Sequence, residues 1–394
     1  MDKSILIISP LEIWSIEKNK GAPTVARTVN GYADRGWKVH YISGTAHTNI
    51  DEISKRNIEI YDFDSPLMKR LFEIPKVSFF ARIIWWIRFQ ITAIWIGFQI
   101  NDEFDIAYGY ETTGVPAAKI WSIYTGCPMV SRFQGTKLYP RMELNFWRIR
   151  FWQSVLAYKI PTDLTIMTND GTQGDVVLDQ LNHRSEKMLF LMNGVDKDLF
   201  RSPANTAENP DFDFDSPILL TVSRLVSWKR VDRAIRALPE VVETHPETTL
   251  VIVGDGPEQS SLEEQACNLG VRENIHFAGA VPHDQIPQYL NSSDIFLSLF
   301  DISNVGNPLL EALTAGCCIV TLDTGATGTI ITDGENGKLL SQNSLDNLPK
   351  VIIDLISDDN MRFMLESNAS DFADKQLWTW EERIDREIKA VSAL

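Results

Sequence analysis

The sequence is poor in cysteine, and its cysteines do not have the spacing of a metal site. Its 394 residues include 4 cysteines, of which Cys317 and Cys318 are adjacent within an apolar run. Two neighbours in such a run are typical of a buried strand rather than of metal ligands. Cysteine used so sparingly favours a reducing, cytoplasmic compartment, and we expect no bound metal.

Long uncharged apolar runs are also missing. The most apolar segment, residues 77–100, is interrupted by Arg82 and Arg88. Its longest uncharged stretch, residues 89–100, is shorter than the roughly 20 residues that cross a bilayer. The tryptophans and arginines of this segment suit a helix at a membrane interface, and an ordinary amphipathic helix of the core fits them as well. Residues 4–8 have no basic stretch before them and are not expected to form a secretory signal.

Positive charge is scarce, with 37 lysines and arginines against 53 aspartates and glutamates and a net charge of −16. Such an acidic chain is not expected to bind nucleic acid. The excess of acidic side chains lies in the second half. Residues 1–192 carry 22 basic and 20 acidic side chains, whereas residues 193–394 carry 15 basic and 33 acidic side chains. We therefore expect the two halves to have different surfaces and different partners.

Short strand-like runs alternate with helical periodicities along the whole chain. In the first half, strands are expected at residues 4–9, 38–43, 105–110, 129–133, 164–168 and 188–192, and helices at 25–35, 79–99, 115–124 and 144–158. A second series, which follows a connecting loop at 201–216, has expected strands at 218–222, 249–253, 275–277, 294–299 and 317–322. This pattern predicts two α/β domains, each with a doubly wound parallel sheet and ligand-binding loops at the carboxyl ends of its strands.

Two loops of the second series have residues suited to a phosphate-bearing ligand. Arg224 and Lys229, which follow one strand, can together neutralise a diphosphate, although a solvated basic loop has the same composition. Gly254 and Gly256, which follow the next strand, permit a tight turn and a close approach to a flat ligand. Many ordinary turns have that composition too. No GxGxxG motif follows the first strand of the chain, so a nicotinamide-dependent dehydrogenase is not expected.

The loop at residues 301–313 is the most informative one. Pro308 suits the first position of a helix, and free N–H groups at Gly306 and Asn307 would then favour phosphate. Glu311, in the first turn of that helix, can accept two hydrogen bonds from a ribose diol. The alternative for Glu311 is a residue that only complements the helix dipole.

These motifs resemble those of the family 4 glycosyltransferases, which are retaining enzymes of the GT-B fold. The resemblance covers nearly the whole chain and is more specific in the C-terminal half. The matching stretches are Gly21-Ala22-Pro23-Thr24, Asn193-Gly194-Val195-Asp196, Ser223-Arg224-Leu225, Lys229-Arg230, Gly254-Asp255-Gly256-Pro257, His276-Phe277-Ala278-Gly279, Asn307-Pro308-Leu309-Leu310-Glu311-Ala312 and Asp333-Gly334-Glu335-Asn336-Gly337.

The resemblance implies two Rossmann-like domains that face a cleft. Residues 1–192 would bind the acceptor, residues 193–377 a nucleotide-sugar donor, and residues 378–394 would cross back onto the first domain. Arg224 and Lys229 would bind the donor diphosphate, and Glu311 the ribose. The other donor-binding residues would be Gly254, Gly256, Pro257, Val281, Ser303, Asn304, Val305, Gly306 and Asn307. The family needs no metal or other cofactor, so a UDP- or GDP-sugar would enter as a substrate.

Two positions depart from the family's pattern. Ser303 stands where the family has the first of two glutamates, and Asp301 is a candidate to replace that carboxylate. In the first half, Gln134 takes the place of a histidine found in many members. An amide cannot act as a general base. Retaining transfer is usually drawn with the leaving phosphate assisting the attack, and that mechanism does not need the missing histidine.

The acceptor side has no single motif of comparable specificity. Residues 69–98 and 132–159 combine basic and aromatic side chains, which suits an anionic membrane surface or a pyrophosphate-linked lipid acceptor. A soluble enzyme whose aromatic helices pack in the core is the alternative. For His47 a solvated loop histidine is the simpler interpretation, and His40 is expected to be a packing residue. The candidate acceptor residues are Gly21, Ala22, Pro23, His47, Gln134 and Gly135.

The sequence therefore predicts a retaining hexosyltransferase that acts on a saccharide or lipid-linked saccharide in polysaccharide or glycan biosynthesis. We expect it in the cytoplasm or at the cytoplasmic face of the plasma membrane. One alternative is a non-catalytic GT-B protein that binds nucleotide sugars or serves as a scaffold, which the identities of Ser303 and Gln134 motivate. The other is a GT-B enzyme of another reaction type, such as a nucleotide-sugar epimerase.

Overall fold

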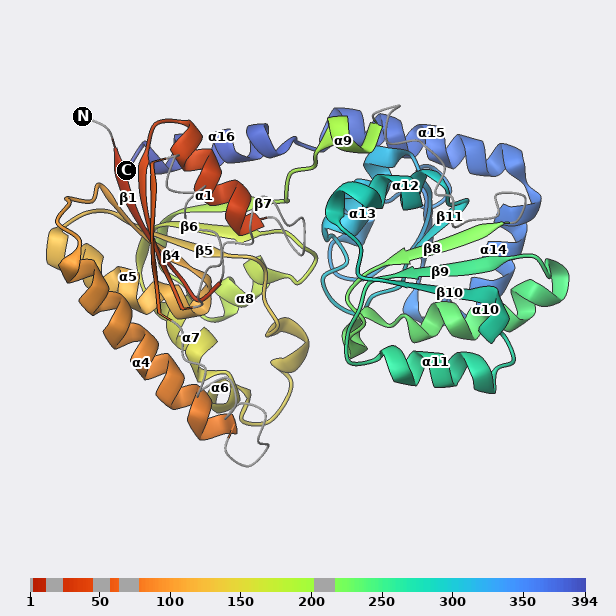
Figure 1. Ribbon diagram of the computed structural model, residues 1–394, viewed down its shortest axis with the longest axis horizontal. Coiled ribbons are helices and arrows are strands. Elements are labelled where there is room, and N and C mark those ends of the chain that lie inside the picture. The colour runs from red at the N-terminus through yellow and green to blue at the C-terminus, as the bar shows by residue number, and fades with distance from the viewer. Residues whose placement is uncertain (1–2, 12–23, 45–56, 64–77, 202–216) are drawn as a thin grey trace. The chain divides into compact units, whose positions relative to one another are not determined.

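The computed structural model describes residues 3–11, 24–44, 57–63, 78–201 and 217–394 (Figure 1). The chain divides into two compact units, each of which is described by itself. The first unit contains Met1–Asn169, Gln173–Met192 and Glu381–Leu394, and the second contains Asp170–Thr172 and Asn193–Trp380. Each unit is built on a parallel sheet with helices packed against it, so the predicted fold class is confirmed.

The sheet of the first unit has seven strands in the order β3-β2-β1-β4-β5-β6-β7. The chain moves outward from β1 to β3, then returns to the other side of β1 at β4. In sheets of this kind the loops part at that reversal and leave room for a ligand. The strands are β1 Ser4–Ser9, β2 Lys38–Ser43, β3 Ile58–Asp62, β4 Ile106–Tyr110, β5 Met129–Phe133, β6 Thr162–Thr168 and β7 Ser185–Leu191.

Helices cover both faces of this sheet, which explains why β1 is apolar along its length. Ile5 and Ile7 belong to a core shared with α1 and α16, whereas Leu6 and Ile8 belong to a core shared with α4, α5, α7 and α8. The helices are α1 Thr24–Asp34, α4 Ser78–Gln99, α5 Glu111–Thr125, α6 Trp147–Arg150, α7 Trp152–Lys159, α8 Gly174–Gln180 and α16 Trp380–Val391.

One expected helix is wrong. Residues 144–158 do not form a single helix, because α6 ends at Arg150 and Phe151 leaves the helical conformation (φ −112°, ψ 32°) before α7 begins at Trp152. The strand β3 was not anticipated either. It pairs with β2 at the edge of the sheet, where fewer apolar residues are needed and the sequence signal is weak.

The sheet of the second unit repeats the same plan with six strands in the order β10-β9-β8-β11-β12-β13. Its reversal lies between β8 and β11. The strands are β8 Ile218–Val222, β9 Thr249–Val253, β10 Ile275–Gly279, β11 Ile295–Ser298, β12 Cys318–Leu322 and β13 Lys338–Leu340. The helices are α9 Lys197–Arg201, α10 Asp232–Thr244, α11 Gln259–Asn268, α12 Ile286–Asn291, α13 Asn307–Ala315, α14 Leu348–Ser357 and α15 Asp359–Gln376.

The end of the chain returns to the first unit. After α15 of the second unit, α16 packs beside α1, where Ile384 fills the space next to Gly31. A Cβ at Gly31 would lie 2.5 Å from Ile384 Cγ2, so a larger residue there would force the Ile384 side chain to shift. The first described residues lie near the end of the chain, since Lys3 Nζ donates to the Ser392 carbonyl oxygen at 3.4 Å.

Candidate functional site

Two loops meet at the reversal of the second sheet. One follows β8 and carries Arg224 and Lys229, and the other follows β11 and carries Ser303. Lys229 Nζ donates to the Ser303 carbonyl oxygen at 3.3 Å and lies 4.0 Å from the centre of the Phe300 ring. Arg224 is exposed. Arg224 and Lys229, the two predicted diphosphate-binding residues, therefore lie at the reversal of strand order, where open α/β sheets bind ligands.

The electrostatics of Lys229 distinguish it from a surface lysine. Burial lowers the pKa of its ammonium to about 8, with the Arg224 charge acting in the same direction and the Asp170 carboxylate opposing both. A partly desolvated ammonium interacts more strongly with a phosphate than a hydrated one does, because the local dielectric constant is lower.

The glycine loop after β9 is tied to the loop after β8. Leu225 N donates to the Asp255 carbonyl oxygen at 2.7 Å, and a Cβ at Gly254 would lie only 1.8 Å from the Ser223 carbonyl oxygen. Gly254 (φ 131°) and Gly256 (φ 156°) are therefore needed for the close approach of one loop to the next. Pro257 is exposed beside them, and Val281 is half-buried shortly after β10.

The residues before α13 are buried and partly unsatisfied. Asn304 and Val305 are each 1% exposed. The Asn304 side-chain amide donates to Thr324 Oγ1, and Asn193 Nδ2 donates to Asn307 Oδ1 at 2.8 Å. The Oδ1 atoms of Asn193 and Asn304 have no hydrogen-bond partner within the described part of the chain. Buried carbonyl groups of this kind are suited to accept from ligand hydroxyls.

The helix α13 begins one residue earlier than expected. Asn307 is its first residue and Gly306 is the N-cap (φ −88°, ψ 171°), so Pro308 lies at the second position. Leu309 N and Leu310 N donate back to the Gly306 carbonyl oxygen at 3.1 and 3.3 Å. Gly306 and Asn307 therefore do lie at a helix start, as the loop composition predicted.

Glu311 has a partner that the sequence did not reveal. It is 5% exposed, and His283 Nε2 lies 2.8 Å from its Oε1 atom. The His283 ring in turn packs edge-on against Phe200 at 5.8 Å. His283 could have been suspected from the sequence because it comes shortly after β10, at the carboxyl end of a strand. The helix-dipole alternative for Glu311 does not explain this contact, because it requires no side-chain partner.

Two carboxylates lie near Ser303 in the chain or in space, Asp301 and Asp170. The sequence pointed to Asp301 alone, and its carboxylate is paired with two arginines. Arg230 Nη1 and Arg233 Nη2 lie 3.2 and 2.6 Å from its two oxygens. Asp170, which sequence reasoning missed, approaches the same loop, because Val305 N donates to the Asp170 carbonyl oxygen at 3.0 Å. Asp170 could have been suspected from the sequence because it comes just after β6, at the carboxyl end of a strand.

In the first unit, Gln134 follows β5 and is held from two sides. Its backbone N donates to Glu111 Oε1 at 2.8 Å, and its Nε2 donates to the Tyr110 hydroxyl at 2.6 Å. Gly135 next to it has a positive φ of 108°. The other acceptor-side candidates, Gly21, Ala22, Pro23 and His47, lie outside the described residues.

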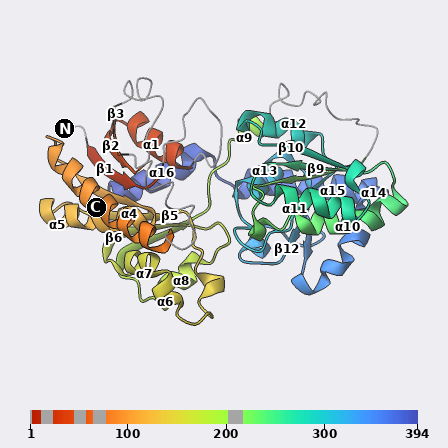
Figure 2. The same ribbon diagram turned by 60° about the horizontal axis from the view of Figure 1, so that its bottom comes forward.

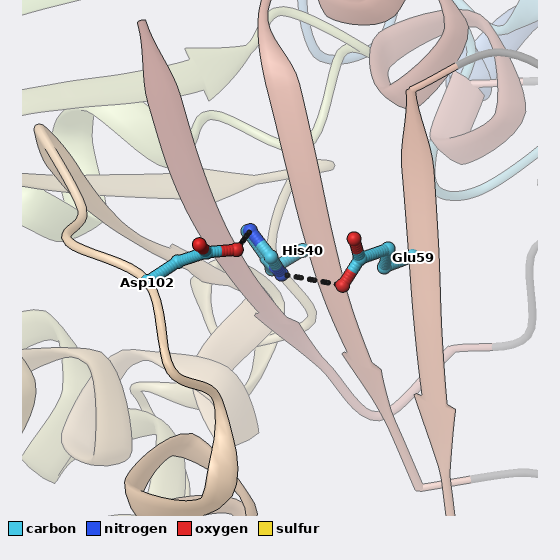
Figure 3. A group of neighbouring side chains, drawn as sticks. All are labelled: His40, Glu59 and Asp102. Atoms are coloured by element: carbon cyan, nitrogen blue, oxygen red, sulfur yellow. Dashed lines mark ion pairs between the residues drawn. The ribbon is translucent and has the colours of Figure 1, made fainter.

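A separate charged cluster lies at the opposite, amino-terminal end of the first sheet (Figure 3). His40 is buried, its Nε2 lies 3.1 Å from Asp102 and its Nδ1 lies 3.4 Å from Glu59. Lys38 Nζ lies 2.6 and 3.0 Å from the same two carboxylates. The lysine already supplies the positive charge that a metal would bring. Phe104 packs edge-on against the His40 ring, so His40 packs in the interior, as expected, and pairs with the two carboxylates as well.

The helix α4 buries one apolar face and exposes another. Phe89 and Ala93 lie in the core. The outward face is apolar over the helix's length, with side-chain exposures that reach 66% at Phe80 and 61% at Trp95; its members are Phe80, Ile84, Ile87, Ile91, Trp95 and Phe98. Figures 1 and 2 show α4 along the outside of the first unit, beside α5. Neither α4 nor another described helix combines the length and hydropathy of a membrane span.

Part of the sequence is similar to known glycosyltransferases. Residues 205–372 match the family described as glycosyl transferases group 1. A GDP-mannose-dependent alpha-(1-6)-phosphatidylinositol monomannoside mannosyltransferase of Mycolicibacterium smegmatis is 32% identical over 151 residues, which are 36% of this chain and 40% of that enzyme. A GDP-mannose-dependent monoacylated alpha-(1-6)-phosphatidylinositol monomannoside mannosyltransferase of Corynebacterium glutamicum is 27% identical over 234 residues, which are 54% of this chain and 60% of that enzyme. The chain thus spans about half the length of these relatives.

Comparison with solved structures covers the whole chain. The structure of Anabaena HepE in complex with UDP and glucose superposes with a TM-score of 0.76 at 20% identity and covers 99% of both chains. Sucrose-phosphate synthase of Thermosynechococcus elongatus gives a TM-score of 0.79 at 14% identity, covering 99% of this chain and 98% of its own. The chain therefore has the two-domain, Rossmann-like α/β fold of the GT-B glycosyltransferases, and its residues 205–372 are similar to the group 1 glycosyl transferases.

Proposed function

We propose that the protein is a retaining glycosyltransferase that moves a hexose from a nucleotide-sugar donor, held by the second unit, to a saccharide or lipid-linked saccharide. The observation that carries the proposal is the meeting of Lys229 and Ser303 at the β8–β11 reversal, 3.3 Å apart, beside the start of α13. The match of residues 205–372 to glycosyl transferases supports a hexosyltransferase enzyme.

In this proposal Arg224 and Lys229 bind the donor diphosphate, and Glu311 accepts from the ribose hydroxyls with its carboxylate oriented by His283. The acceptor oxygen bonds to the anomeric carbon as the bond from that carbon to the diphosphate breaks on the same face. The proton of the acceptor hydroxyl passes to the departing phosphate oxygen. Arg224 and Lys229 stabilise the charge that develops on the diphosphate, a role that a divalent metal fills in other transferases.

The donor is proposed to be a GDP- or UDP-hexose. The mycobacterial and corynebacterial relatives are named for GDP-mannose, and HepE was crystallised with UDP and glucose. The buried Oδ1 atoms of Asn193 and Asn304 are suitable acceptors for hydroxyl groups of the transferred sugar.

A thermal-shift series with UDP-, GDP- and ADP-sugars tests donor binding directly. We expect one of these donors to raise the melting temperature, since a ligand at 100 times its Kd stabilises the native state by about 2.7 kcal/mol. Arg224→Ala should weaken that donor's binding about 10- to 100-fold, because a hydrogen bond to a charged group contributes roughly 1.5–3 kcal/mol.

Arg236→Ala is the matched control, because Arg236 lies on α10 of the same unit and is 57% exposed. It should leave donor binding unchanged. Donor binding without any transfer or donor hydrolysis would favour the non-catalytic alternative. Equal losses in Arg224→Ala and Arg236→Ala would contradict the assigned diphosphate site.

The acceptor side is proposed to contact an anionic membrane surface. The exposed apolar face of α4 is flanked by the exposed Arg82 and Arg88. Trp86 of α4 packs on Trp152 of α7 at 4.9 Å, and the basic residues Arg148 and Arg150 of the neighbouring helix α6 are exposed. Apolar side chains with neighbouring arginines are typical of surfaces that bind anionic lipids, and two relatives are named for acceptors built on phosphatidylinositol.

Flotation with liposomes tests this surface. The protein should float with vesicles that contain anionic phosphatidylglycerol, more strongly at low than at moderate salt, and Ile91→Glu combined with Trp95→Glu should abolish flotation. The control is Phe363→Glu with Met364→Glu on α15 of the second unit, where the side chains are similarly exposed at 64% and 44%. Failure of the unaltered protein to float at both salt concentrations would reject the membrane proposal.

A further inference from the structure

A buried carboxylate that the proposed mechanism does not use lies in the second unit. Asp170 follows β6 in the chain, yet Asp170–Thr172 belongs to the second unit. The segment is held tightly, since Val305 N donates to the Asp170 carbonyl oxygen at 3.0 Å. A Cβ at Gly325 would lie 2.1 Å from the Gly171 carbonyl oxygen, so backbone also encloses Gly171 from a second side. The position of Asp170 is therefore fixed by its neighbours.

The Asp170 side chain is almost enclosed. It is 9% exposed, and its Oδ1 accepts from Thr172 N at 3.2 Å and Thr172 Oγ1 at 2.5 Å. The Ser303 hydroxyl also donates to this carboxylate, and the Lys229 ammonium faces it. Burial raises the pKa of Asp170, while the hydroxyls of Thr172 and Ser303 and the charge of Lys229 lower it. Burial is the largest of these effects, so the pKa of Asp170 is raised above its ordinary value despite these partners.

Ser303 links the carboxylate to the lysine. Its carbonyl oxygen accepts from Lys229 Nζ at 3.3 Å, and its hydroxyl donates to Asp170. Ser303 holds a left-handed backbone conformation with φ 62°, which a residue other than glycine adopts only when its surroundings require it. Asp301, two residues earlier, is already paired with Arg230 and Arg233.

We propose that Asp170 is a positioning residue of the donor site, which through Ser303 holds the Lys229 ammonium directed at the donor diphosphate. This inference rests on the proposed function of the second unit. In this inference Asp170 supplies a carboxylate to the loop in which Ser303 replaces the glutamate of the family pattern. The groups that face Lys229 are Asp170, the Arg224 guanidinium, the Ser303 carbonyl and the Phe300 ring.

The pH dependence of nucleotide binding separates this role from a purely structural one. In the unaltered protein, binding of the preferred nucleoside diphosphate should weaken as the pH rises through about 8, where Lys229 loses its proton. Asp170→Asn removes the negative charge that raises the pKa of Lys229, so the midpoint should move to lower pH by about one unit. Asp301→Asn removes an equal charge from the neighbouring loop and should leave the midpoint unchanged.

Lys229→Arg provides the decisive comparison, because a guanidinium does not titrate in this range. In that background the loss of binding above pH 8 should disappear, and Asp170→Asn should no longer shift any midpoint. Asp170→Ser gives the same measurement if the asparagine variant does not fold. An unchanged midpoint in the Asp170 variants overturns the inference, whereas failure of the unaltered protein to bind any nucleotide overturns the proposed function instead.

Discussion

Glu387→Ala should lower the free energy of unfolding of the first unit by about 3–5 kcal/mol. The Glu387 carboxylate on α16 is completely buried. It accepts from the Arg132 guanidinium, from Arg383 Nη1 at 2.6 Å and from the Tyr108 hydroxyl at 2.7 Å. Removing the carboxylate leaves two buried guanidinium groups without their counter-charge. Loss of one partner of a buried ion pair destabilises a protein far more than replacement of the whole pair by apolar residues.

The measurement is urea unfolding followed by tryptophan fluorescence, to which the first unit contributes most of the tryptophans. Glu381→Ala on the same helix is the control. Its carboxylate is 76% exposed and pairs with Arg35 at 2.8 Å, so its loss should cost at most about 1 kcal/mol. Similar losses in the two variants would contradict the importance assigned to the buried cluster.

The same cluster predicts a sensitivity to acid. Burial alone would raise the pKa of Glu387, but the Arg132 and Arg383 charges outweigh burial and lower it. A carboxyl with a depressed folded-state pKa contributes stability that is present above its ordinary pKa, about 4.3, and is lost as the pH falls below it. The stability difference between the unaltered protein and Glu387→Ala should therefore narrow as the pH falls below about 4.

Lys229→Ala should reduce kcat/KM for the donor by about 10²–10³-fold, the usual cost of removing one preorganised group from a developing negative charge. Lys229 lies 3.3 Å from the Ser303 carbonyl oxygen and is desolvated enough for its pKa to fall to about 8. Desolvation strengthens the attraction between the protonated Lys229 and a phosphate at the place where the donor diphosphate is proposed to bind. The check is a transfer assay with the donor identified by thermal shift.

Two variants make the Lys229 result interpretable. Lys229→Arg keeps the charge, so it should retain more activity than Lys229→Ala. Lys375→Ala removes an exposed lysine from α15 of the same unit, where Lys375 pairs with Asp371 at 3.3 Å on the surface, and should leave activity unchanged. A Lys229→Ala enzyme that transfers sugar at the rate of the Lys375→Ala enzyme would falsify the assignment of Lys229 to the donor site.

Local pattern was sufficient for most of the two sheets. β2, β5, β8 and β9 lie where the sequence predicted them, because each is a short apolar run bounded by polar or turn residues. The local sequence pattern did not predict two strands at the sheet edges, and it predicted one continuous helix where the structure has two. β3 and the three-residue β13 owe their strand conformation to pairing with a neighbour, and Phe151 breaks the helix expected at 144–158 through its local backbone angles.

The sequence by itself determined the fold class and the loops after β8, β9 and β11, because the carboxyl ends of parallel strands gather at one edge of a sheet whatever else the chain does. Only the tertiary structure decided which charged groups meet there. Asp170 is distant in the chain from Lys229 and Ser303, and His283 is distant from Glu311, so no local spacing links them. Their roles follow from burial, since a carboxylate or an ammonium removed from water must find a partner, and only the folded chain determines which partner that is.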